Sequence, residues 1–154
     1  MSQVRDELAI RKSIVVSCSV ERAFRVFTEE IGTWWPFAHG HSIFGAEAET
    51  AVVEGRVGGR VYERSRTGEE AGWGTITAWE PPHRLAMTWH PGRGEETAQE
   101  LEVCFSPEGG ATRVDLVHTG WEHVGARVDE TVAGYDKGWD FVLGRYVEAA
   151  GREN

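Results

Sequence analysis

Six short runs of alternating polar and apolar residues lie between Thr50 and Thr119, and turn-forming residues separate them. In chain order the runs are TAVVEG, GRVYERS, GWGTITAWE, RLAMTWH, QELEVCFS and TRVDLVHT. Alternation with a period of two is typical of strands that bury one face, and connections this short join antiparallel neighbours. Paired glycines in the last connection, PEGGA, supply the positive φ that a tight hairpin needs. The sequence therefore predicts a meander of six antiparallel strands.

A further strand and a helix are predicted before this meander. The segment LAIRKSIVVSCS has a period-two pattern that Lys12 alone interrupts, and its apolar side consists of Ile10, Ile14, Val16 and Cys18. Ser19 is a good N-cap for the helix that follows, and apolar residues then recur at three- and four-residue spacing as far as Ile31. Gly32 and Pro36 end this pattern.

Residues 127–151, RVDETVAGYDKGWDFVLGRYVEAAG, predict a long amphipathic helix. Its apolar and aromatic residues fall within an arc of about 100°, and they are Val128, Val132, Tyr135, Trp139, Val142, Leu143, Tyr146 and Ala150. The opposite face is polar apart from Phe141. Glycines at positions 134, 138 and 144 each cost about 1 kcal/mol relative to alanine. Tertiary packing must therefore stabilise this helix.

The predicted elements combine into one α+β domain. They form a curved antiparallel sheet of about seven strands wrapped around the C-terminal helix, with a short helical segment after the first strand. An aromatic helix face against a curved sheet is compatible with a cavity between the two. The length of 154 residues fits a single domain over residues 1–154.

The order of these elements resembles the helix-grip fold of the START-related superfamily, also called SRPBCC. Several motifs are similar to those of the bacterial homologues of the activator of heat-shock-protein ATPase, a polyketide cyclase-like family: VERAFRVFTEEIGTWWP, GGRVYER, GWGTITAWEPPHRLAMTW, LVHTGW and GWDFVLGRYV. The resemblance covers nearly the whole chain. It implies the helix-grip fold and a pocket under the C-terminal helix. It implies no catalytic residues, because proteins of this fold serve as binders, cyclases and chaperone cofactors alike.

Charge and hydropathy exclude some classes of partner. The chain has 16 Lys and Arg against 25 Asp and Glu, a net charge of -9, which disfavours nucleic-acid binding. No apolar run approaches the roughly 20 residues of a membrane span, and the N-terminus lacks a secretory apolar segment. We therefore expect a cytoplasmic protein that binds neither nucleic acid nor membrane. Cys18 and Cys104 match no metal or disulfide spacing and are expected to be reduced, buried thiols.

The stretch IGTWWPFAHGHSIFG, residues 31–45, concentrates aromatic and imidazole side chains. Its aromatic residues are equally compatible with a corner of the core and with a flap at the mouth of the cavity. His39 and His41 have the spacing of two zinc ligands, but no third ligand lies nearby in the sequence. We therefore expect an exposed loop around these histidines, and neither a metal nor another cofactor.

Glu63 and His118 are the candidates for acid–base chemistry. Alternation places both on the inward side of their strands, where desolvation can shift a pKa far enough for proton transfer. In the alternative interpretation, which we favour, both are hydrogen-bonded polar groups that tie strands together. Neither has a nucleophile beside it in the sequence, and no nucleophile elbow, phosphate loop or dinucleotide fingerprint occurs.

The leading functional hypothesis is a non-catalytic protein that binds a small hydrophobic or aromatic molecule in the cavity. The predicted binding residues are mainly aromatic: Trp34, Trp35, Phe44, Trp73, Trp89, His118, Tyr135, Trp139 and Tyr146. One alternative is a cyclase or dehydratase that uses Glu63 or His118 as acid and base. Another is a cofactor of a chaperone ATPase. We expect a monomer, or a weak homodimer that uses Phe141 on the polar face of the helix.

Overall fold

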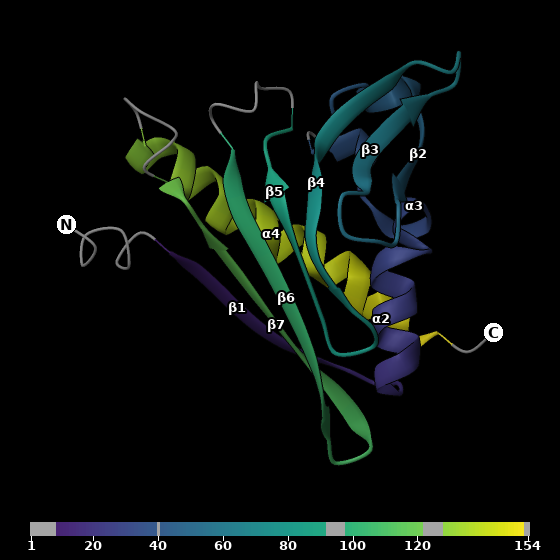
Figure 1. The fold of residues 1–154 in the computed structure, drawn as a ribbon, viewed down its shortest axis with the longest axis vertical. Coiled ribbons are helices and arrows are strands. Elements are labelled where there is room, and N and C mark those ends of the chain that lie inside the picture. The colour runs from purple at the N-terminus through teal and green to yellow at the C-terminus, as the bar shows by residue number, and fades with distance from the viewer. Residues whose placement is uncertain (1–8, 40, 92–97, 122–127, 153–154) are drawn as a thin grey trace.

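A seven-stranded antiparallel sheet curls around one long helix in the computed structural model of the protein (Figure 1). The structure describes residues 9–39, 41–91, 98–121 and 128–152. The sheet order is β1-β7-β6-β5-β4-β3-β2, formed by β1 (Ile10–Val16), β2 (Ala48–Val53), β3 (Arg60–Ser65), β4 (Glu70–Glu80), β5 (Arg84–Trp89), β6 (Gln99–Glu108) and β7 (Ala111–Thr119). The long helix is α4 (Val128–Gly151), which crosses one face of the sheet. The predicted α+β helix-grip fold is confirmed.

Short helical segments connect β1 to β2: α2 (Val20–Thr28), α3 (Ile31–Trp34), and the 3-10 turns η1 (Phe37–His39) and η2 (Gly45–Glu47). As predicted, Ser19 caps α2, because its side chain accepts a hydrogen bond from the Arg22 N–H at 3.2 Å. The apolar stripe predicted to run to Ile31 is instead divided between α2 and α3. Glu30 lies between them with a non-helical ψ of 17°. None of the described helices has the length and apolar character that crossing a membrane requires.

Contacts between β1 and α4 explain why Lys12 interrupts the apolar side of its strand. Lys12 faces the helix, where its Nζ lies 2.9 Å from Asp136 and 3.0 Å from Asp140. Burial lowers the pKa of this ammonium, but the hydrogen bonds and charges of the two carboxylates outweigh burial and raise the pKa above its ordinary value. The lysine therefore ties the first strand to the helix.

The end of the sheet nearest α2 is filled by a close-packed aromatic core. Phe24 and Phe27 of α2 pack edge-to-face against Phe105 of β6, at ring-centroid distances of 5.2 and 5.8 Å. Tyr146 of α4 lies 5.1 Å from Phe27, and its hydroxyl donates to the Ala23 carbonyl at 2.7 Å. Each fully buried aromatic side chain contributes roughly 1.5–3 kcal/mol to folding. These contacts anchor the C-terminal half of α4 against α2.

Packing along α4 changes from one end to the other. The predicted inner face is buried toward the C-terminus: Trp139, Val142, Leu143, Tyr146 and Ala150. Val132 and Tyr135, one to two turns earlier, are only half-buried, and the side chain of Val128, predicted on the same face, is not among those described. Phe141, predicted on the opposite face, is 42% exposed. The N-terminal half of α4 is therefore the part of the helix that is less completely packed against the sheet.

Cys18 and Cys104 are both free, half-buried thiols. Burial raises the pKa of each of them, and the carboxylate of Glu102 raises the pKa of Cys104 further. A raised pKa keeps a thiol protonated and weakly reactive at neutral pH. Both cysteines therefore act as small apolar side chains in this fold.

Candidate functional site

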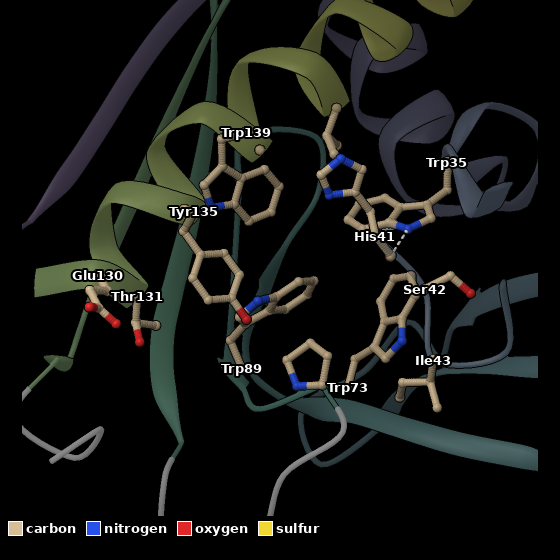
Figure 2. Close-up of a pocket in the computed structure, with 14 residues that line it drawn as sticks. Trp35, His41, Ser42, Ile43, Trp73, Trp89, Glu130, Thr131, Tyr135 and Trp139 are labelled. Carbon is tan, nitrogen blue, oxygen red and sulfur yellow. Dashed lines mark hydrogen bonds between the residues drawn. The ribbon is translucent and has the colours of Figure 1, made fainter. Parts of the chain in front are cut away.

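A cavity of about 440 Å³ lies between the N-terminal half of α4 and strands β4 and β5 (Figure 2). Aromatic side chains form much of its wall: Trp35, Trp73, Trp89, Tyr135 and Trp139. The remaining lining residues are His41, Ser42, Ile43, Pro91, Glu130, Thr131, Gly134, Gly138 and Val142. Glu130 and Gly134 are exposed, so the cavity opens to solvent along this side of α4. Its volume lies within the range of about 300–1,000 Å³ typical of small-molecule pockets.

The cavity wall brings together tryptophans from separate parts of the chain. Trp35 follows α3, Trp73 lies in β4, Trp89 ends β5 and Trp139 lies in α4. Successive ring centroids are 4.7 Å (Trp35 to Trp73), 5.6 Å (Trp73 to Trp89) and 5.6 Å (Trp89 to Trp139) apart. None of these side chains is more than 7% exposed. Together they offer a rigid aromatic surface against which a planar ring can stack.

His118 holds Trp139 in place from behind the cavity wall. The indole Nε1 of Trp139 donates to His118 Nδ1 at 3.0 Å, and His118 Nε2 lies 3.0 Å from Gln99 Oε1. An indole nitrogen is only a donor, so Nδ1 must be the unprotonated nitrogen and Nε2–H donates to the glutamine. The histidine ring also stacks on Trp121 at 4.3 Å. One imidazole tautomer therefore fixes the orientation of the central cavity tryptophan.

These contacts leave His118 little capacity for proton transfer. The residue is fully buried, and burial lowers its pKa to about 3. Both ring nitrogens are already hydrogen-bonded to protein side chains, and the residue does not line the cavity that the described residues form. The geometry thus favours the interpretation of His118 as a satisfied polar group that positions Trp139.

Glu63 has a similar supporting role on the opposite wall. Its carboxylate accepts hydrogen bonds from Ser42 Oγ at 2.5 Å, Ile43 N at 2.8 Å, Phe44 N at 3.0 Å and Trp73 Nε1 at 2.8 Å. Every one of these contacts comes from a donor, so both oxygens serve as acceptors. The side chain is fully buried and does not face the cavity. Glu63 therefore ties residues 42–44 and the Trp73 indole to β3.

Residues 41–43, which follow Trp35 in the chain, line one side of the cavity, and His41 packs against α4. The Trp35 indole donates to the His41 carbonyl at 2.7 Å (dashed in Figure 2). The His41 ring stacks on Phe141 at 5.7 Å and approaches Gly138 so closely that a Cβ at that position would lie 3.2 Å from the ring. His39 packs on the same phenylalanine at 5.2 Å. Burial lowers the pKa of His41, and the neighbouring His39 lowers it further.

The predicted binding residues separate into two groups in the structure. Those brought together at the cavity are Trp35, Trp73, Trp89, Tyr135 and Trp139. Trp34 and Tyr146 instead contact each other in the aromatic core, with ring centroids 5.2 Å apart, and the Trp34 indole donates to the Val26 carbonyl at 2.8 Å. Phe44 contributes its backbone N–H to Glu63 and does not line the cavity.

Several lining residues were not predicted, and for one of them, Gly138, the sequence carried a signal that a contact in the structure explains. Gly134 and Gly138 lie one turn apart on α4 beside Tyr135 and Trp139, in a helix where glycine is unfavourable. Glycines that weaken a helix indicate close approach of another group, and at Gly138 that group is His41. Ser42 and Ile43 have no such signal, because their position depends on hydrogen bonds to a distant strand.

Comparisons with known proteins agree with this architecture. A family profile described as activator of Hsp90 ATPase homolog 1-like protein matches residues 17–148. Among proteins with curated descriptions, none matches the sequence.

Solved structures similar to this chain include two of appreciable sequence identity. An anthrahydroquino-γ-pyrone synthase is 35% identical, with 91% of this chain and 95% of that chain covered and a TM-score of 0.62. CalC, a self-sacrificing resistance protein from Micromonospora echinospora, is 28% identical, with coverages of 95% and 97% and a TM-score of 0.69. The Aha1 dimer from Colwellia psychrerythraea is 16% identical, with coverages of 92% and 95% and a TM-score of 0.66, and it shows similarity of fold alone.

Proposed function

The chain belongs to the family of activator of Hsp90 ATPase homolog 1-like proteins, and from this premise we propose that it binds a planar aromatic small molecule in the cavity beside α4. The observation that carries the proposal is the arrangement of Trp35, Trp73, Trp89 and Trp139 around a space of about 440 Å³. A ring system stacked on such a wall gains apolar burial together with oriented aromatic contacts, each worth roughly 0.5–1.5 kcal/mol beyond its area. The family and its relatives support a ligand-binding or cyclase-type function.

The hydrogen bonds of Glu63 and His118 favour ligand binding over acid–base catalysis by these two residues. Glu63 and His118 are fully hydrogen-bonded to protein groups and lie behind the tryptophans. A general acid or base must lie within hydrogen-bond reach of the reacting group. Their role in the proposed function is therefore to hold Trp73 and Trp139 in fixed orientations, which reduces the entropy lost on binding.

A cyclase is the second candidate, and one observation favours it: the relative with 35% identity is named as an anthrahydroquino-γ-pyrone synthase. For this alternative the chain offers His41, whose ring lines the cavity. Burial and the neighbouring His39 lower its pKa, so the ring is neutral near pH 7 and able to accept a proton. The cavity would then hold a flexible precursor in a folded conformation while His41 removes a proton. The chaperone-cofactor alternative rests on the family description alone.

Two helix glycines offer a matched test of the proposal. Among the residues that the structure describes, Gly134 lines the cavity and Gly144 does not, and a Cβ added at either position meets no described atom within 4 Å. Leucine at either site should raise helix propensity similarly, but only Gly134→Leu places a side chain in the cavity mouth. Native mass spectrometry of protein purified from cells should detect a bound small molecule in the wild type and in Gly144→Leu, and a much reduced amount in Gly134→Leu.

Two results would count against the proposal. One is equal retention of the molecule by both variants. The other is failure of the wild type to bind any of a panel of planar aromatic compounds, measured by tryptophan fluorescence quenching. The cyclase alternative is tested separately, since His41→Ala should then abolish turnover of a candidate precursor while leaving product binding in place.

Domain organisation, cellular location and oligomeric state are properties of the whole protein. A single domain over residues 1–154, a cytoplasmic location, and a monomeric or weakly dimeric state stay predictions from the sequence. Sedimentation velocity at increasing protein concentration tests the oligomeric state directly.

A further inference from the structure

The indole nitrogen of Trp89 is a buried donor for which the described residues provide no acceptor. The other buried tryptophans in the described part of the chain all donate to a protein group. Trp35 and Trp34 donate to the backbone carbonyls of His41 and Val26, Trp121 to the carbonyl of His118, Trp73 to Glu63 and Trp139 to His118. Buried polar groups are hydrogen-bonded in the great majority of cases. The exception therefore calls for a specific explanation.

Trp89 is one of the residues that line the cavity, so a bound ligand would lie against its side chain. It ends β5, is 4% exposed, and its ring lies 5.6 Å from both Trp73 and Trp139. In Figure 2 its indole lies between the ring of Tyr135 and that of Trp73. The unpartnered donor thus belongs to a side chain surrounded by the aromatic faces on which a planar ligand would stack.

We propose that the bound ligand is a planar aromatic compound carrying an oxygen acceptor at its ring edge, such as an aryl ketone or quinone carbonyl, and that Trp89 Nε1 donates to this oxygen. This inference rests on the proposed function and adds the ligand's chemical class. An indole N–H only donates, so the matching ligand atom must be an acceptor. The bond also supplies direction, since a carbonyl oxygen accepts best near the plane of its own ring system. A pure aromatic hydrocarbon would leave the donor unpaired.

The test compares two ligands that differ in one carbonyl group, fluorenone and fluorene. Both are planar three-ring molecules, and only fluorenone carries an acceptor. The dissociation constants of both are measured for the wild type and for Trp89→Phe, which keeps an aromatic ring but removes the N–H. The preference for fluorenone over fluorene should fall about threefold to tenfold in the variant, the range expected for one neutral hydrogen bond.

Trp35→Phe is the matched control, because it also shortens a cavity indole but its N–H is already bonded to the His41 carbonyl. It should weaken both ligands alike and leave their ratio unchanged. The carbonyl stretching frequency of bound fluorenone gives a second measurement that needs only the wild type. This frequency should lie below its value in a solvent that donates no hydrogen bond, and it should rise in Trp89→Phe.

The outcomes separate this inference from the proposed function. If both ligands bind but the affinity ratio is the same in wild type and Trp89→Phe and the carbonyl band is unshifted, the acceptor inference fails and aromatic binding stands. If neither ligand binds, the proposed function fails and this inference fails with it. If Trp89→Phe does not fold, an unshifted carbonyl band in the wild type alone overturns the inference.

Discussion

Replacing Glu63 with glutamine should loosen residues 42–44, which the Glu63 carboxylate holds beside the cavity. The carboxylate accepts four hydrogen bonds, from Ser42 Oγ, the backbone N–H groups of Ile43 and Phe44, and the indole of Trp73. In Glu63→Gln the new NH₂ group must face at least one donor that previously met an oxygen. The Ser42 hydroxyl can turn to accept, but a backbone N–H cannot.

The expected loss follows from these contacts. Hydrogen bonds to a charged group contribute about 1.5–3 kcal/mol each, and a buried donor left without a partner costs about 1–3 kcal/mol. In Glu63→Gln one N–H loses its partner and the remaining hydrogen bonds become weaker. The free energy of unfolding should therefore fall by roughly 3–5 kcal/mol, which urea denaturation measures. Amide hydrogen exchange of residues 42–45 should accelerate more than that of β7.

Glu49→Gln is the control for this substitution. Glu49 is an exposed carboxylate on the neighbouring strand β2, with one contact to Arg64 at 3.1 Å. Removing such a surface charge should change stability by less than about 1 kcal/mol. A loss below about 1 kcal/mol for Glu63→Gln, with unchanged exchange at residues 42–45, would refute the anchoring role assigned to Glu63.

Other predictions follow from the same contacts. The pKa of His118 is lowered to about 3 in the folded protein, so below about pH 6.5 the unfolded chain binds a proton that the folded chain does not, and stability falls with falling pH by about 1.4 kcal/mol per unit. In His118→Gln the slope between pH 6 and 4 should be smaller by nearly one proton, and equal slopes would contradict the assignment. Gly144→Ala should raise the free energy of unfolding by about 1 kcal/mol, whereas Gly138→Ala should raise it less because the added Cβ meets His41. Urea denaturation of both variants measures these changes, and equal increases would argue against the contact with His41. Phe141→Ala should accelerate amide exchange at residues 41–43 while costing less than about 1 kcal/mol, and unchanged exchange would show that this ring does not hold the segment.

The secondary structure of this chain was predictable because its signals are local. The alternating runs from Thr50 to Thr119 correspond to β2 through β7, and the helix predicted over residues 127–151 corresponds to α4. Ser19 was predicted as an N-cap from its residue type and position alone, and it caps α2. These assignments depend on periodicity and capping, which a few neighbouring residues determine.

The division of the aromatic residues between core and cavity was not predictable from the same signals. Trp139 and Tyr146 share one face of α4, but seven residues separate them by about 10 Å along the helix axis. That distance places Trp139 at the cavity and Tyr146 against α2, where its hydroxyl reaches the Ala23 carbonyl. Periodicity specifies the angle of a side chain around a helix. Periodicity does not specify which part of the fold packs against the helix at each position along its axis.

The positions of Trp34, Trp35 and Glu63 depend on partners that are distant in the sequence. Trp34 and Trp35 are adjacent, yet one indole donates to the Val26 carbonyl in the core and the other to the His41 carbonyl at the cavity. Glu63 was placed correctly on the inward side of its strand, but its main partners lie about twenty residues earlier in the chain. Only the folded arrangement shows that it supports the cavity wall and does not face a ligand.

A nitrogen-15 spectrum of the tryptophan indoles tests the central claim most directly. Fluorenone is titrated into uniformly labelled protein, and the indole N–H signals are assigned by single Trp→Phe variants. We predict saturable shifts at the cavity tryptophans, Trp35, Trp73, Trp89 and Trp139, with the largest at Trp89, whose N–H gains a new acceptor. Trp34 and Trp121, which donate to backbone carbonyls away from the cavity, should not move. No shift at saturating ligand, or shifts mainly at Trp34 and Trp121, would contradict an aromatic-binding cavity beside α4.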